Sequence, residues 1–418
     1  MKQPLTPRLL IFLTVFVDLL GFGIIIPILG PIGAEYLPPE LAGRAVALLM
    51  ASFSVLQMVC SPFWGRLSDK YGRRPILLLS LCGSTASYVI FALAPSFGWI
   101  LLSRMLAGFF GANITTAMAY IADITPDRDR TAGMGLIGMA FGLGFALGPV
   151  LGAGASILGQ TQGIHPQVVL GVMAGAICGL NLVWAAARLP ESLPPEKRGQ
   201  VSFRRFATLR RMTQTLRHEL VGPLILLFFV LTFAFANVET AFGIFARFEL
   251  GMDLEGGAGD ATLAPHENPI YTQIYALFVL IGLVMAVVQG WFIRKAVKFV
   301  PEQLWIVIGN GILAVGLFFF PFARSPGDLI LPVVILAVGQ GIANPCVLSL
   351  ISRNTPADRQ GDVFGTSQSM SSLARIIGPL FAGLIYDFGG PRWPFWAARE
   401  PVLLAAAWAN RARWRLIR

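Results

Sequence analysis

Charged residues are scarce in this chain of 418 residues. They make up 13% of the sequence, 55% is hydrophobic and the mean hydropathy is +0.69, whereas soluble domains carry about a quarter charged residues. A soluble globular fold is therefore excluded. Histidine and cysteine are also rare, with three and four copies. Because the cysteines are far apart and no nucleophile–base spacing or phosphate loop occurs, we expect no disulfide framework, no metal, no cofactor and no enzymatic activity.

Long apolar stretches are abundant instead. Each has about 20 residues, enough for an α-helix to cross a hydrocarbon layer about 30 Å thick, and a helix satisfies its own backbone hydrogen bonds there. We predict an all-α membrane protein with twelve transmembrane helices, at residues 8–30, 44–64, 75–94, 97–120, 133–156, 167–188, 221–246, 271–293, 303–323, 329–350, 365–387 and 394–410. The last span is the least typical, because Arg399 and Glu400 interrupt it.

The basic residues predict an orientation. Most of the 32 Lys and Arg residues lie on one side of the membrane if the spans alternate, among them Arg66, Lys70 and those in the stretch 188–217. Positively charged loops are retained in the cytoplasm. We therefore predict that both termini are cytoplasmic and that the chain lies in the plasma membrane, which in a bacterium is the inner membrane. The net charge of +10 then needs no nucleic-acid partner.

The chain contains an internal repeat. A shift of 230 positions without a gap places identical residues on one another: Ile121 on Ile351, Thr125 on Thr355, Pro126 on Pro356, Gly135 on Gly365, Gly148 on Gly378 and Pro149 on Pro379. This predicts two pseudo-symmetric six-helix bundles, residues 1–189 and 221–418, with a substrate site between them. The segment 190–220 is predicted to be a basic cytoplasmic linker, which either lies on anionic lipid or is solvated.

The loop between the second and third spans reads Gly-Arg-Leu-Ser-Asp-Lys-Tyr-Gly-Arg-Arg-Pro. Its glycines permit tight turns and close helix approach, its Asp stands at a helix end, and its arginines offer forked donors to carbonyl or carboxylate oxygens. The spacing resembles the loop signature of the major facilitator superfamily. That resemblance implies that a cluster of five residues latches the two halves in one access state: Gly65, Asp69, Gly72, Arg73 and Arg74.

Two further segments resemble motifs of this family. Arg104 stands in the middle of the fourth span, where a charge is costly and usually faces a cavity or a partner. The fifth span carries glycines at four-residue spacing and a Gly-Pro step, which predict a smooth packing face and a bend. This fifth-span pattern is similar to the motif of the drug:proton antiporter branch, at Gly138, Gly142, Gly148, Pro149 and Gly152.

Asp18 and Glu239 are the two acids that we place well inside spans, one in each half. A carboxyl group in a low dielectric stays neutral until a change of access or a cationic neighbour favours ionisation, as a proton carrier requires. With the motifs above, the segment around Asp18 resembles the twelve-helix drug:H+ antiporters, in particular the tetracycline-efflux group. That group carries an acid in its third helix where Ser87 stands here, so tetracycline is not assigned as the substrate.

The resulting hypothesis is that Asp18 exchanges a proton for substrate, that Arg104 biases its protonation, and that Glu239 takes part or binds cationic substrate. A purely structural role for either acid stays open. Arg375 is a partner either for Glu239 or for an anionic group. Polar residues inside spans either join helices or line a cavity, and five are candidates: Gln57, Asn113, Gln289, Gln340 and Asn344.

The predicted function is secondary active transport. We expect a monomer that exports small lipophilic compounds or drugs in exchange for protons, by alternating access. Two alternatives stay open. One is a symporter or facilitator that imports a small polar metabolite on the same fold, because fold does not determine function. The other is a membrane receptor or assembly factor that transports nothing.

Overall fold

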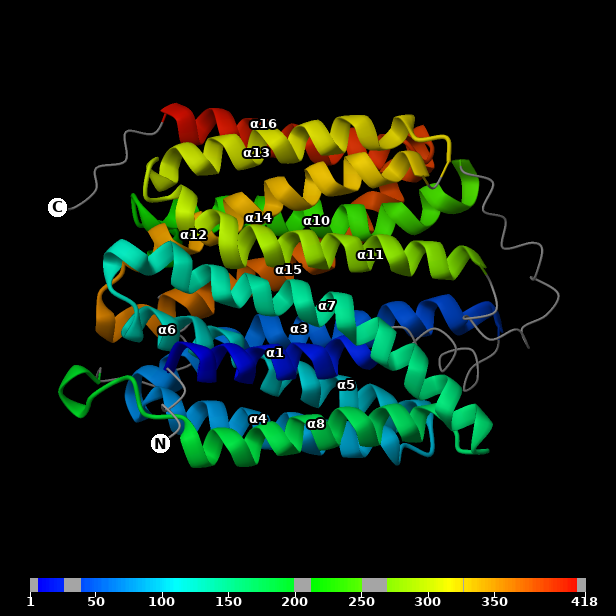
Figure 1. Ribbon diagram of the computed structural model, residues 1–418, viewed down its shortest axis with the longest axis horizontal. Helices are drawn as coiled ribbons and strands as arrows, with labels where there is room; N and C mark the ends of the chain where they lie inside the picture. The colour runs from blue at the N-terminus through cyan, green and yellow to red at the C-terminus, as the bar shows by residue number, and fades with distance from the viewer. Residues whose placement is uncertain (1–6, 26–38, 199–211, 250–268, 326, 412–418) are drawn as a thin grey trace.

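The computed structural model describes residues 7–25, 39–198, 212–249, 269–325 and 327–411. Within these ranges the chain is helical and has no strand, which confirms the predicted all-α class. Of the predicted linker at 190–220, residues 199–211 lie outside the described part. Long helices lie side by side along one axis (Figure 1).

The helices before residue 190 are called the N-half. They are α1 (Pro7–Ile25), α3 (Pro39–Tyr71), α4 (Arg73–Ala92), α5 (Phe97–Gly111), α6 (Ile114–Ile124), α7 (Arg130–Thr161) and α8 (Pro166–Arg188). Those after residue 220 are called the C-half. They are α10 (Val221–Glu249), α11 (Pro269–Val287), the π-helical turn η5 (Val288–Phe292), α12 (Ile293–Ala296), α13 (Glu302–Phe319), α14 (Ile330–Arg353), α15 (Gln360–Gly389) and α16 (Trp393–Arg411).

Ten helical segments in the described residues are long and apolar enough to cross a membrane. Two predicted spans, 44–64 and 394–410, are not among them, although both are helical, in α3 and α16. In α16 the two interrupting charges pair with each other, since Arg399 Nη2 lies 2.6 Å from Glu400 Oε1. The pairing lowers the cost of keeping both charges on an otherwise apolar helix.

The internal repeat is visible in the helix starts. A short 3-10 turn, Asp127–Asp129, precedes α7, and its counterpart 230 positions later, Ala357–Arg359, precedes α15. Contacts between the halves are concentrated in two helix pairs, α3 with α15 and α7 with α11. The shift carries α7 onto α15, so the two pairs are pseudo-symmetric counterparts.

Two irregularities position the functional residues described below. The α5–α6 span is interrupted at Ala112 and Asn113, where backbone bonds such as Asn113 N–H to Phe110 O (3.2 Å) replace the α-helical pattern. In the C-half, α11 continues into α12 through the π-helical turn η5. Such turns are frequent at functional sites because they redirect a side chain.

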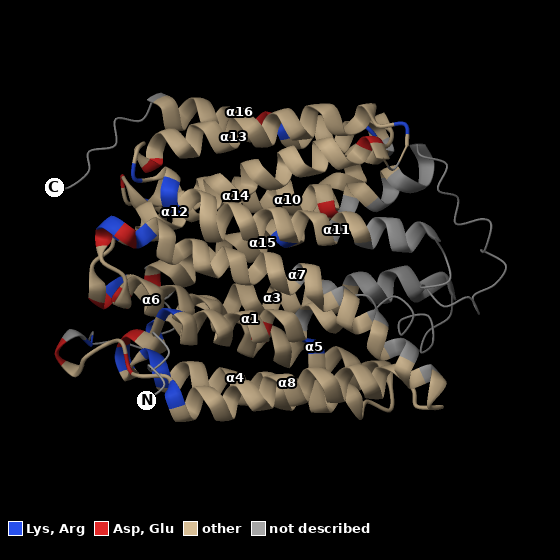
Figure 2. Cartoon of the chain, viewed as in Figure 1, with Lys and Arg blue, Asp and Glu red and all other residues tan. Residues whose placement is uncertain are grey.

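Charged residues gather mainly at one end of the bundle, which holds α12, the end of α6 and the α3–α4 loop (Figure 2). The middle of the bundle shows few of them. This end is called the charged end below. It is the end that the positive-inside rule predicts to face the cytoplasm.

Candidate functional site

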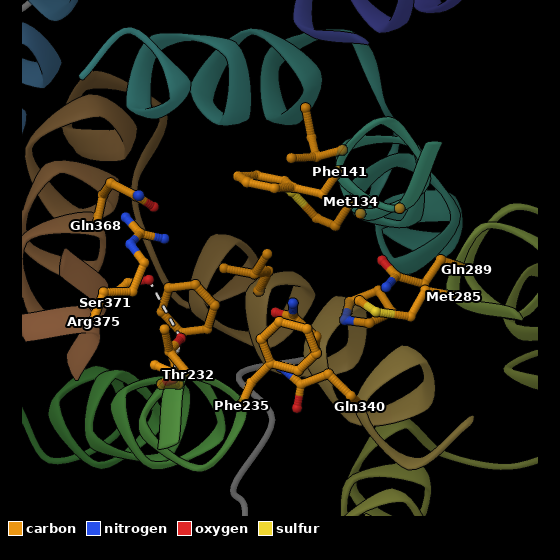
Figure 3. A pocket seen from close by; sticks show the side chains of 18 of the residues that line it. Met134, Phe141, Thr232, Phe235, Met285, Gln289, Gln340, Gln368, Ser371 and Arg375 are labelled. Atoms are coloured by element: carbon orange, nitrogen blue, oxygen red, sulfur yellow. Dashed lines mark hydrogen bonds between the residues drawn. The ribbon is translucent and has the colours of Figure 1, made fainter. Parts of the chain in front are cut away.

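A cavity of about 120 Å³ lies between the two halves (Figure 3). Helices α6 and α7 line it from the N-half, and α10, α11, η5, α14 and α15 line it from the C-half. Most of its wall is apolar and adaptable, which is typical of small-molecule sites. The large apolar side chains are Met118, Met134, Phe141, Phe228, Phe235 and Met285.

Two charged residues line this cavity in the described part of the chain, Glu239 on α10 and Arg375 on α15. They attract each other electrostatically, but no ion pair within 4 Å joins them. Arg375 Nη2 instead donates to Gln57 Oε1 (2.5 Å) and Ser372 Oγ (3.1 Å). The carboxyl group and the guanidinium therefore both face space that a ligand can enter.

Side-chain amides supply the remaining polar surface. Gln289 on η5 and Gln340 and Asn344 on α14 line the cavity, which is one of the two roles that the sequence left open for them, and Gln368 on α15 joins them. One amide atom of each has no hydrogen-bond partner among the described residues. Because a buried polar group without a partner is costly, these atoms are suited to bind water or a polar substrate group.

The other two predicted cavity residues, Gln57 and Asn113, do not line this cavity. Gln57 is turned from α3 toward α15, where it accepts the hydrogen bonds from Arg375 and Ser372. Asn113 stands at the break between α5 and α6. Both join helices, which is the alternative that the sequence left open.

Asp18 lies on α1, away from the lining of the central cavity. Asn113 Nδ2 donates to its Oδ2 (3.3 Å), and Ser84 on α4 is a second hydrogen-bond partner. Ser87, the position compared with the acid of the tetracycline-efflux group, donates instead to Gly83 O of its own helix (2.7 Å). These two hydrogen-bond partners of Asp18 are thus neutral groups.

Arg104 is buried on α5 and does not pair with Asp18. Its guanidinium lies 5.0 Å from the Phe91 ring and 6.0 Å from the Tyr88 ring, contacts of the cation–π kind. Tyr88 interacts electrostatically with both Asp18 and Arg104. The hypothesis that Arg104 biases Asp18 stays a prediction.

The glycines of α7 form two packing faces. Toward the C-half, a Cβ atom at Gly142 would lie 2.6 Å from Gly282 O, and one at Gly138 would overlap the Gln289 carboxamide. Toward α1, a Cβ atom at Gly148 or Gly152 would lie within 2.6 Å of the backbone of Gly23 or Ile24. The helix continues through Pro149, whose side chain lies outside the described residues.

Gly142→Ala is expected to lower transport about tenfold. The added methyl group meets Gly282 O, so α7 and α11 must separate at the cavity wall, and overpacking of this kind costs about 1–3 kcal/mol. Gly154 is the matched control on the same helix, because a Cβ atom there has nothing within 4 Å. Initial transport rates in proteoliposomes measure the effect. Equal rates for Gly142→Ala and Gly154→Ala would contradict it.

At the charged end, Asp69 joins the two halves. Its Oδ1 accepts from the backbone N–H of Gly361 (3.0 Å) and its Oδ2 from that of Asp362 (2.9 Å), in the first turn of α15. A carboxylate is favoured there by the helix dipole and the free N–H groups. Arg73, fully buried, donates to Asp69 Oδ1 (2.5 Å) and to Asp123 Oδ2 (3.0 Å). These contacts form the centre of the predicted latch.

The other residues of the loop signature divide between the two sides. Gly65 meets Gly361, and a Cβ atom at Gly65 would lie 1.9 Å from Gly361 O. Gly72 has a φ of +101°, a conformation that favours glycine. Arg74 donates to Ala186 O (2.7 Å) at the end of α8. Gly65 and Asp69 therefore contact the C-half, whereas Gly72 and Arg74 shape the N-half around them.

A second contact between the halves was not predicted from the sequence. Glu302, buried in the first turn of α13, accepts a hydrogen bond from Thr131 at the start of α7. It also accepts from Ser349 Oγ (2.9 Å) and from Arg353 Nη1 (3.1 Å) on α14. Glu302 was missed because it follows Pro301 at a span edge and resembles an ordinary helix-start acid.

The contact at Glu302 and the contact at Asp69 have similar surroundings in the two halves, but the acid and the arginine have exchanged helices. The shift of 230 positions pairs Thr131 with Gly361 and Asp123 with Arg353. In the N-half an arginine on α4 binds the acid at the end of α6, whereas in the C-half an acid on α13 binds the arginine at the end of α14. The shift itself places Gly72 on Glu302 and Arg73 on Gln303, so the two arrangements correspond as helix pairs and not residue by residue.

Thr131→Val is expected to shift the protein toward opening at the charged end by about tenfold. It removes one hydrogen bond to a charged group, worth about 1.5–3 kcal/mol, across the halves. Ser349→Ala is the control, because it removes a bond to the same carboxylate inside the C-half. Spin labels on cysteines at the exposed positions Arg128 and Asp358, with the four native cysteines replaced, report the separation. Equal distance distributions in both variants would refute the prediction.

Comparisons with known proteins agree with this geometry. The sequence profile of the Major Facilitator Superfamily matches residues 11–379 and 306–411. The class C tetracycline resistance protein of Escherichia coli is 30% identical over 91% of this chain and 89% of that protein. The class E protein of Escherichia coli is 31% identical, over 91% and 88%. The crystal structure of the human organic anion transporter MFSD10 (TETRAN) superposes with a TM-score of 0.82 at 26% identity, covering 96% of this chain and 98% of that one.

Proposed function

Because the chain belongs to the major facilitator superfamily and is a membrane transporter of small molecules rather than an enzyme, we propose that it exports small lipophilic compounds in exchange for protons. The observation that carries the proposal is the cavity between the halves, apolar over most of its wall, with one acid and one base facing its interior. The similarity to tetracycline resistance proteins supports drug export. Alternating access follows if the contacts at the charged end break and re-form.

The net charge of the cavity relates the charge of the substrate to the direction in which protons move. With Glu239 ionised, the pair of Glu239 and Arg375 is neutral overall; with Glu239 protonated, the cavity carries one positive charge. A cationic substrate therefore competes with the proton, which gives antiport, whereas an anionic substrate binds together with it, which gives symport. Antiport with a cationic or neutral lipophilic compound is the first candidate.

Proton-coupled transport of an organic anion is the second candidate. Arg375 favours it, because a guanidinium facing an apolar cavity binds a carboxylate well, and the structural neighbour is named as an organic anion transporter. Uptake of a small polar metabolite is the alternative raised by the sequence. The same amides and the same guanidinium are suited to bind such a substrate. The direction of proton movement on substrate binding separates these candidates from antiport.

The proposal includes the setting of the protein. We place it as a monomer in the plasma membrane, with the charged end and both termini in the cytoplasm. Residues 1–189 and 221–418 are the two bundles that move against each other, and the segment 190–220 is the linker between them. The concentration of Lys and Arg at the charged end (Figure 2) supports this orientation.

Expression in a host stripped of efflux pumps tests the function. Wild type is expected to raise resistance to some lipophilic cations or antibiotics of a broad panel at least about fourfold, and Asp18→Asn to abolish that gain, because the variant keeps the shape of the side chain but carries no proton. Asp358→Asn, an exposed acid at the charged end, is the control. If wild type and Asp18→Asn give the same susceptibility throughout the panel, the exporter proposal fails.

A further inference from the structure

Gln57 connects the two halves in the middle of the bundle. Its side chain is 6% exposed. Oε1 accepts hydrogen bonds from Arg375 Nη2 (2.5 Å) and Ser372 Oγ (3.0 Å) on α15, and Nε2 donates to Gly111 O (3.1 Å) at the end of α5. A single carboxamide thus links the cavity wall of the C-half to a backbone carbonyl of the N-half.

The carbonyl that Gln57 binds belongs to the break between α5 and α6. Asn113, two residues further on, is the residue that donates to Asp18 Oδ2 (3.3 Å). Because the regular helical hydrogen bonds are interrupted here, the junction can shift without unfolding either helix. A displacement of Gly111 therefore also displaces Asn113, and Asp18 loses one of its two hydrogen-bond partners and keeps the other, Ser84.

At the other end of the link, two hydrogen-bond acceptors and one acid compete for Arg375. Gln57 and Ser372 hold its Nη2 at the cavity wall, and Glu239 attracts it across the cavity. Glu239 and Arg375 are the charged residues among the described lining residues of the cavity. A proton or a cation on Glu239 removes the attraction and leaves Arg375 with Gln57, whereas an ionised Glu239 or an anionic group in the cavity draws Arg375 away.

We propose that Gln57 is a positioning residue that couples the charge of the central cavity to Asp18. While Arg375 binds Gln57, the carboxamide stays on Gly111 O and Asn113 stays on Asp18. When Arg375 turns into the cavity, Gln57 is released, the α5–α6 junction relaxes and Asn113 leaves Asp18. The inference deepens the proposed function, since it makes the two candidate proton carriers act in sequence rather than independently.

The first test is a double-mutant cycle on protein without substrate in lipid nanodiscs. Hydrogen–deuterium exchange of the amides at 112–118 is measured for Gln57→Met, Arg375→Gln and the double variant. Each single change is expected to raise the exchange rate about tenfold. The double variant is expected to exchange no faster than either single variant, because both changes break the same link. Gln340→Met, a matched change in the cavity wall outside the link, is expected to leave exchange at the junction unchanged. If the increase in exchange rate of the double variant equals the product of the two single increases, the proposal is overturned.

The second test follows the Asp18 carboxyl group by infrared spectroscopy over a pH series, with Asp18→Asn identifying its band. Arg375→Gln is expected to shift the titration midpoint of that band when Gln57 is present and to leave it unshifted in the Gln57→Met background. A purely structural role of Gln57 does not produce this dependence, and an equal shift in both backgrounds contradicts the proposal. Neither test uses a transported compound, so failure of the exporter proposal leaves both tests valid.

Discussion

Glu239→Gln is expected to lower proton-driven transport at least about tenfold and to leave the protein folded, which is the largest effect expected of a single substitution in the cavity. The Glu239 side chain lines the central cavity and a smaller one beside it, and no hydrogen bond to a described residue holds it in place. Gln keeps its size and polarity, so the packing of α10 is preserved. The variant loses only the exchangeable proton and the negative charge.

The measurement separates coupling from binding. In proteoliposomes, proton-driven transport is expected to fall at least about tenfold, a common loss when an acid–base group is removed, whereas substrate counterflow, which needs no net proton movement, continues. Asp328→Asn, an exposed acid outside the cavity, is the control. Undiminished proton-driven rates in Glu239→Gln would exclude Glu239 as a proton carrier.

The same variant distinguishes the two candidate substrates. Without its negative charge the cavity carries the positive charge of Arg375 alone, so a lipophilic cation is expected to bind more weakly and an organic anion more tightly. Binding of tetraphenylphosphonium and of benzoate to the purified variant, compared with wild type, gives the sign of each change. Weaker binding of both probes would remove the electrostatic argument for either candidate.

Asp69→Ala is expected to open the charged end almost completely. The carboxylate that it removes accepts two backbone N–H groups of α15 and one bond from buried Arg73. Only the two bonds from α15 cross the halves. A hydrogen bond to a charged group is worth about 1.5–3 kcal/mol, so the loss of both corresponds to a shift of about a hundredfold or more in the equilibrium between closed and open forms. Transport falls because the protein no longer returns to the closed form at this end.

Spin labels at positions 128 and 358 measure this opening as a longer distance between the halves. Ser68→Ala is the matched control, since Ser68 accepts a hydrogen bond from Arg73 (2.8 Å) but makes no contact across the halves through its hydroxyl group. A variant Asp69→Ala with the wild-type distance distribution would show that the Gly65–Gly361 contact and the Glu302 contact suffice to hold the closed form.

The sequence by itself determined the helical class, the placement of ten of the twelve predicted spans and the internal repeat. These properties depend on local quantities: an apolar run either reaches across a hydrocarbon layer or does not, and a duplicated segment keeps its spacing. The loop signature also depends on spacing, so its five residues were found together. The start of α15 lies 230 positions after that of α7, as the repeat requires.

Only the tertiary structure decided which polar side chains meet. Glu239, Arg375, Gln289 and Gln340 share one cavity, whereas Asp18, equally central in its own span, lies outside it. The reason is that a partner depends on the rotation of each helix about its axis and on packing between distant segments: Gln57 and Arg375 are 318 positions apart. Hydropathy does not contain that information, so neither the Gln57 link nor the Glu302 contact followed from the sequence.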